Sequence, residues 1–186
     1  MQTLTLTAVP TKVYNQNDQN PCIFSNPACS PGPVGFGATA LPTGGNETSY
    51  DFLSPVYTGS QLLTILNGAS MLIGIDINQN GNAQTLTSFT MIKNTVVVDT
   101  FTGSTGNVPD QSNGNGWADF VLGNFSSFVA GDSIQFHFVF NNANDGTENV
   151  FLISGPTAAT PEPVTLALTG SGLLGLFFLR KRFAKR

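Results

Sequence analysis

One short segment of the chain carries the spacing of oxygen ligands around a calcium ion. Asp76, Asn78 and Asn80 alternate along the chain, and Gly81 follows at once. Side-chain oxygens at alternate positions, with a glycine at the sharp turn, form the first half of the EF-hand calcium loop. The spacing therefore predicts a calcium site at Asp76, Asn78 and Asn80.

The second half of that loop departs from the calcium pattern. Thr87 stands at the twelfth position, where the loop requires a bidentate glutamate, and a strand pattern rather than two helices flanks the segment. Two interpretations stay open: a calcium site completed by Asp145 or Glu148, and a tight polar hairpin that binds no ion. No other cofactor is expected.

The only two cysteines, Cys22 and Cys29, are seven residues apart in a proline-flanked segment. Their spacing is not that of a redox motif, and a single histidine leaves too few ligands for a typical zinc site. In an oxidising compartment the pair would close a small ring and restrict the unfolded chain. We expect a disulfide if the protein is exported, with two free thiols as the alternative.

The sequence shows no arrangement of residues typical of an active site. His137 lies in an alternating segment on the face opposite Phe136 and Phe138, so we expect it to face solvent. No motif fixes a nucleophile beside it, and no pair of acids is placed by sequence for glycoside hydrolysis. We therefore expect a protein that is not an enzyme and has no catalytic residue.

Hydrophobic periodicity predicts an all-β fold. Apolar residues alternate with polar ones over 4–8, 71–77 and 134–140, and no helical period competes before residue 164. Further strands are expected at 34–40, 61–66, 85–92, 95–101, 117–122 and 149–153. Turn signals at 80–81 and 145–146 predict hairpins. The pattern favours an antiparallel β-sandwich of jelly-roll or Ig-like type over residues 1–154.

Charge divides the chain into two unlike parts. Residues 1–160 hold two basic and ten acidic residues, for a net charge of −8, whereas residues 161–186 hold five basic and one acidic residue, for +4. A body this acidic lacks the basic surface that offsets phosphate repulsion, so no nucleic-acid partner is expected. Residues 155–160 have no charge and no large side chain, which is typical of a flexible linker.

The last 26 residues contain an apolar segment bounded by prolines and cations. Residues 164–179 carry no charge, and their apolar side chains occupy all faces of a helix. Such a helix would rise about 24 Å, just short of a ~30 Å hydrocarbon core. We expect a single transmembrane helix at 164–179 in the lipid bilayer, with the cations that follow it held in the cytoplasm and residues 1–160 on the opposite side.

The order of these parts resembles the PEP-CTERM sorting signal of exported bacterial proteins. The resemblance implies that Pro161, Glu162 and Pro163 are the recognition element, that residues 164–179 are the membrane span, and that the stop signal is Arg180, Lys181 and Arg182. It also implies that the partner is an exosortase, which cleaves near Pro-Glu-Pro. The segment from Gly68 to Ile153 is loosely similar to the bodies of such proteins.

The resemblance implies a cellular location and a class of function. The protein would be anchored in the inner membrane of a Gram-negative-type bacterium and then passed to the cell surface or the extracellular matrix, with a structural or binding role. The first ten residues, MQTLTLTAVP, lack the pattern of a secretory leader, so we expect the leader upstream of Met1. The alternatives are a carbohydrate-binding module of the extracellular polysaccharide and, third, a secreted hydrolase.

Overall fold

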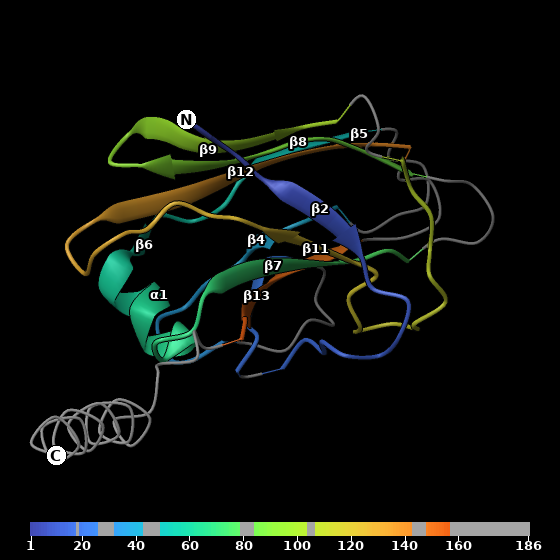
Figure 1. Ribbon diagram of the computed structural model, residues 1–186, viewed down its shortest axis with the longest axis horizontal. Coiled ribbons are helices and arrows are strands. Elements are labelled where there is room, and N and C mark those ends of the chain that lie inside the picture. The colour runs from blue at the N-terminus through green and yellow to red at the C-terminus, as the bar shows by residue number, and fades with distance from the viewer. Residues whose placement is uncertain are drawn as a thin grey trace, which may run out of the picture. The chain divides into compact units, whose positions relative to one another are not determined.

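The computed structural model describes residues 1–17, 19–25, 32–42, 49–78, 84–103, 107–142 and 148–156. Two β-sheets lie over one another and a short helix lies at one end of them (Figure 1). The chain divides into two units, Met1–Pro156 and Thr157–Arg186, and the second unit lies outside the described residues. The prediction of an all-β fold is confirmed.

The first sheet has seven strands built around the antiparallel ladder of β8 and β12. Its order is β1-β9-β8-β12-β5, with β10 paired to β8 and β6 paired to β12. Its strands are β1 (Gln2–Thr3), β5 (Ser49–Leu53), β6 (Tyr57–Thr58), β8 (Gln84–Lys93), β9 (Val96–Thr102), β10 (Asn107–Val108) and β12 (Ser133–Asn141).

The second sheet has six strands in the order β2-β11-β7-β13-β3-β4. They are β2 (Thr5–Ala8), β3 (Cys22–Ser25), β4 (Thr39–Ala40), β7 (Met71–Asp76), β11 (Phe120–Gly123) and β13 (Asn149–Ser154). The pairs β1–β9 and β3–β4 are parallel, which corrects the expectation of a purely antiparallel sandwich. In each parallel pair, one partner is a two-residue strand at the edge of its sheet. The two strands of such a pair are not joined by a tight hairpin, so they need not run antiparallel.

Aromatic side chains from both sheets fill the space between them. In β12, Phe136, Phe138 and Phe140 are fully buried, as their recurrence at every second position predicts. The ring of Phe24 in β3 lies 5.4 Å from that of Phe138, so this pair joins the two sheets. Burying a side chain of this size contributes about 1.5–3 kcal/mol, so each of these rings adds substantially to the stability of the fold.

A helix, α1 (Gly59–Leu66), takes the place of the strand predicted at 61–66. The cause is a capping box at its start: the Thr58 hydroxyl accepts a hydrogen bond from the Gln61 backbone N–H at 3.2 Å, and the Gln61 side chain accepts one from the Thr58 N–H at 2.8 Å. Leu62 and Leu66, one turn apart, are buried. Gly59 is required, since a Cβ there would lie 1.9 Å from the carbonyl oxygen of Val129.

Both predicted hairpins are wrong, although their turn residues lie outside the described residues. β7 and β8 belong to different sheets, and so do β12 and β13, so each connection crosses from one layer to the other. A hairpin instead joins β8 to β9 through Asn94 and Thr95, at φ 50° and 69°. Two expected strands are also shorter than predicted, since 34–40 reduces to β4 and 117–122 begins only at Phe120.

Candidate functional site

A buried carboxylate ends the strand β7. Asp76 is 1% exposed because β7 lies between β11 and β13 in the second sheet. Its Oδ2 accepts a hydrogen bond from the Gly116 backbone N–H at 2.7 Å and a longer one from the Asn149 side-chain amide at 3.4 Å. Asn149 is the direct cross-strand partner of Asp76 in β13, so the sheet register sets this contact.

Two more buried carboxylates lie beside this strand end. Asp119, just before β11, is 1% exposed and accepts the backbone N–H of Ile77 at 2.8 Å. Glu148, just before β13, is fully buried and accepts the backbone N–H of Asn78 at 2.6 Å. The two carboxylates therefore fix the backbone of Ile77 and Asn78, which follow Asp76. We refer to Asp76, Asp119 and Glu148 as the acidic cluster.

Burial shifts the titration of the acidic cluster. Loss of solvation raises the pKa of Asp76 from 3.8 to about 6 and that of Glu148 from 4.5 to about 7, and it also raises the pKa of Asp119. The negative charges of Asp119 and Asp110 add to the rise at Asp76, while backbone and side-chain hydrogen bonds oppose it. No lysine or arginine within the described ranges forms an ion pair with a member of the cluster.

One polar atom next to the cluster has no hydrogen-bond partner in the described part of the chain. Gln84, at the start of β8, is fully buried, and its amide nitrogen donates to Glu148 Oε1 at 2.5 Å. The oxygen of the same amide, Oε1, is buried, and none of the described residues donates a hydrogen bond to it. An unsatisfied buried acceptor costs about 1–3 kcal/mol, so this oxygen lowers the stability of the folded state.

The predicted calcium ligands fall partly within this cluster. Asp76 is a member, Asn78 contributes its backbone N–H to Glu148, and Asn80 lies outside the described residues, as does Asp145. Of the residues that the structure describes, no three His, Cys, Asp or Glu side chains are close enough together to hold a metal ion. The calcium prediction at these three residues stays a prediction.

Sequence reasoning missed Asp119 and Gln84 at this site. They lie 43 and 8 residues beyond Asp76, and only the pairing of strands brings them together. The run from Asp110 to Asp119 holds two acids, amides and glycines, and this composition could have indicated that Asp119 belongs to a polar site. This run supplies the Gly116 N–H that donates to Asp76 and the Asp119 carboxylate that accepts the Ile77 N–H.

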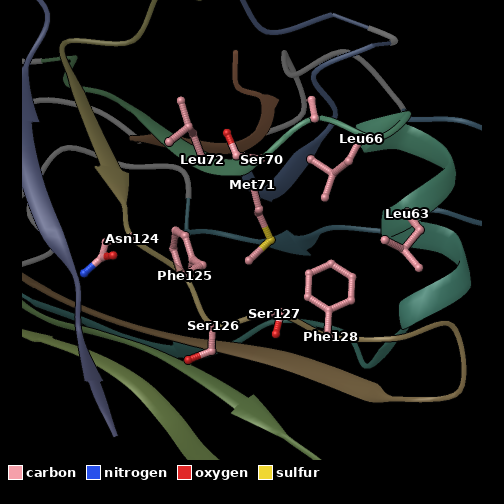
Figure 2. A pocket seen from close by; sticks show the side chains of 11 residues that line it. Leu63, Leu66, Ser70, Met71, Leu72, Asn124, Phe125, Ser126, Ser127 and Phe128 are labelled. Carbon is pink, nitrogen blue, oxygen red and sulfur yellow. The ribbon is translucent and has the colours of Figure 1, made fainter. Parts of the chain in front are cut away.

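A groove of about 370 Å³ lies at the other end of β7, where this strand begins. Figure 2 shows Met71 beside Phe125 and Phe128 of the segment that follows β11, with Leu63 and Leu66 approaching from α1. Asn124, Ser126, Ser127 and Ser70 supply its polar lining. The groove is mainly apolar and holds no cluster of titratable side chains among the residues that line it.

The groove wall is fixed by a buried acid from the first sheet. Asp99 in β9 is fully buried and accepts hydrogen bonds from the backbone N–H of Ser126 at 2.9 Å and from its hydroxyl. Asn124, at φ 70°, donates its side-chain amide to the Thr3 carbonyl at 2.8 Å. The segment after β11 is thus held by both β9 and the N-terminal strand.

His137 lies on the solvent face of the first sheet, as predicted. Its Nε2 is 2.6 Å from Asp51 Oδ1 of the neighbouring strand β5, and the two side chains are 32% and 75% exposed. An exposed pair of this kind contributes about 0–1 kcal/mol. The contact is therefore a surface pair between adjacent strands.

The remaining predicted site residues lie largely outside the described part of the chain. Cys22 begins β3 and is 3% exposed, but its expected disulfide partner Cys29 is outside the described residues, as are the whole sorting signal and residues 164–179. Within the described segments, no helix has the length and apolar character needed to cross a bilayer. The disulfide and the membrane span stay predictions.

Comparison with known proteins identifies no relative of this chain. It matches no protein-family model, no curated protein and no solved structure.

Proposed function

We propose that this is an exported bacterial protein of the cell surface or extracellular matrix, sorted and processed through its C-terminal 26 residues. The observation that carries the proposal is the order of the tail: Pro161-Glu162-Pro163, an uncharged apolar stretch at 164–179, and Arg180-Lys181-Arg182. This order resembles the PEP-CTERM signal that an exosortase cleaves. The β-sandwich is then the mature part, with a structural or binding role and no catalytic activity.

The structure of the described residues agrees with a division into a mature β-sandwich and a C-terminal segment that is removed. Its last strand, β13, ends at Ser154, and the next backbone N–H, that of Gly155, donates to the Ser70 carbonyl at 2.8 Å. The carbonyl of Pro156 accepts the Ser70 hydroxyl at 3.3 Å. Cleavage near Pro161 would therefore leave every described strand in the mature protein.

Charge supports the proposed orientation in the membrane. Five of the seven basic residues follow the apolar stretch, whereas residues 1–160 have a net charge of −8. Basic residues flanking a span are retained in the cytoplasm, so the acidic body lies on the outer side of the inner membrane before processing.

The test is the C-terminus of the mature protein. In a host that carries the exosortase, mass spectrometry should find the chain shortened near Pro161, and in a host without it the chain should keep residues 161–186. Replacing Pro161 and Pro163 by alanine should leave the precursor uncut, whereas Thr157→Ala, a change in the linker, should leave processing intact. An identical C-terminus with and without the enzyme would contradict the proposal.

A role in binding polysaccharide is the second candidate within the proposed function. Aromatic side chains that stack on sugars must be accessible, and Tyr50 and Tyr57 are buried in the core. Trp117 and Tyr14 are partly exposed and lie on segments linked by the bridge between Asn15 and Trp117. Glycan-array binding that is lost in Trp117→Ala and kept in a matched Phe128→Ala variant would favour this candidate.

A further inference from the structure

We infer that the groove at the start of β7 binds an acyl chain of a bilayer phospholipid, so that this end of the sandwich rests on the membrane surface. The groove lies between α1 and the segment that follows β11. The inference rests on the proposed function, because the membrane is the one in which residues 164–179 would be anchored.

The first argument is the lining of the groove. Its volume of about 370 Å³ falls within the range of pockets that hold small molecules. The side chains of Met71, Phe125 and Phe128 give it an apolar wall, as Figure 2 shows. A ligand would therefore meet mainly carbon atoms along this wall.

Most of the polar groups at the groove already have partners within the chain. The Ser126 hydroxyl donates to Asp99, and the Asn124 amide donates to the Thr3 carbonyl. The Ser70 hydroxyl donates to the Pro156 carbonyl. These groups offer little to a ligand rich in hydroxyls, such as a sugar, whereas a hydrocarbon chain needs none of them.

The second argument is the distribution of charge. The residues that line the groove come from two stretches that contain no charged residue, 54–75 and 120–131. Residues 1–160 as a whole have a net charge of −8, and the acidic cluster lies at the opposite end of β7. The groove can therefore approach lipid without removing a charged side chain of its own from water.

Apolar surface continues beyond the groove. Leu63 of α1, which lines it, is 39% exposed, and Val129, which follows Phe128, is 65% exposed. The two lie on adjacent parts of the fold, because the backbone of Gly59 at the start of α1 packs against the Val129 carbonyl. Apolar side chains that gather at one exposed place are typical of a membrane contact.

The third argument is the point at which the chain leaves the sandwich. Ser70 lines the groove, and its carbonyl accepts the Gly155 N–H at 2.8 Å, two residues before the described chain ends. Seven residues separate Pro156 from Val164, where the proposed span begins. A chain of that length reaches at most about 28 Å. The proposed anchor therefore holds the groove near the bilayer, where the effective concentration of lipid is high.

A lysine beside the groove indicates the type of head group. Lys93 Nζ donates to the carbonyl of Ser127, a lining residue, at 3.0 Å, and its charge acts on the neighbouring Asp132. Both signs of charge are thus present beside the groove. A zwitterionic phospholipid fits such a rim, with its phosphate toward Lys93.

The test is photolabelling of the full chain in vesicles of phosphatidylcholine, a small part of which carries a diazirine in one acyl chain. After irradiation, mass spectrometry locates the lipid adducts. We expect adducts in the groove segments, 59–72 and 124–129, and few in β5, which lies in the other sheet. Adducts in 164–179 report separately on the proposed anchor.

A matched pair of variants tests the groove itself. Leu63→Gln places an amide in the groove wall and should lower the labelling of the groove segments by roughly three-fold or more, because a lipid chain cannot hydrogen-bond to that amide. Leu53→Gln changes a 50% exposed leucine of β5 and should leave this labelling unchanged. Circular dichroism checks that both variants keep the fold.

Each pattern of labels has one meaning. Adducts in the groove that Leu63→Gln removes and Leu53→Gln keeps support the inference, and if 164–179 is then unlabelled the proposed anchor alone is contradicted. Adducts in 164–179 without adducts in the groove overturn the inference and leave the proposed function intact. Labels spread evenly over the sandwich, or groove labels that survive in Leu63→Gln, also overturn it. An unlabelled groove together with a dimer that Leu63→Gln dissociates would assign the groove to a second copy.

Discussion

Replacing Glu148 by glutamine should stabilise the metal-free protein at alkaline pH. Burial raises the pKa of Glu148 from 4.5 to about 7 in the folded state, so folding favours its protonated form. This contribution is fully present below pH 4.5 and is lost as the pH rises through 7. A difference of about 2.5 pKa units corresponds to roughly 3 kcal/mol at 1.36 kcal/mol per unit.

The neutral amide of the Glu148→Gln variant retains the contacts of the protonated acid. Its oxygen would accept the Asn78 N–H, and after a half-turn of the Gln84 amide, whose nitrogen faces this position in the wild type, its nitrogen would donate to Gln84 Oε1. The gain relative to wild type should therefore be small at pH 4.5 and should grow by about 3 kcal/mol by pH 8.

Urea denaturation with chelator present, followed by the fluorescence of Trp117, measures the free energy of unfolding of both proteins across this range. Asp51→Asn controls for the loss of a carboxylate at an exposed position. A variant that is less stable than wild type at pH 8, or a difference that does not change with pH, would refute the account of the buried charge.

Two further predictions concern the body of the fold. Phe136→Ala should lower the free energy of unfolding by about 3–5 kcal/mol in urea denaturation, because its ring is fully buried and contacts those of Tyr57, Phe89 and Phe125. A loss of less than about 1 kcal/mol would contradict the place of Phe136 in the core. Thr58→Ala should lower the free energy of unfolding by about 1 kcal/mol, because it removes the N-cap of α1, whereas Thr58→Ser should keep most of that stability. Equal stability of the two variants would show that the cap contributes nothing.

The fold was predictable from sequence wherever one strand buries one face. β12 covers its predicted segment, because apolar residues recur at every second position from Ile134 to Phe140. The helix α1 was missed although its capping box, Thr58 to Gln61, is visible in the sequence, since a short segment rich in leucine and isoleucine fits a strand equally well. The hairpins were wrong because turn chemistry does not reveal which sheet receives the next strand.

The candidate site was only partly predictable. Asp76 stood out because its neighbours repeat in the spacing of a calcium loop. Glu148 was one of two acids that could complete that loop, and Asp119 gave no signal, because both reach Asp76 only through the pairing of β7 with β13 and with β11. Burial, which sets the titration of all three acids, depends on the packing of two complete sheets and not on local sequence.

The position of β13 imposes an order of events on the folding of the chain during its synthesis. It is the last described strand along the chain, yet it lies inside the second sheet between β7 and β3. Until residue 154 has emerged, β7 and β3 have no shared neighbour and the sheet remains in two halves. Completion of the second sheet must therefore wait for residue 154, and any trimming enzyme that acts before Gly155 would remove the strand that joins those halves.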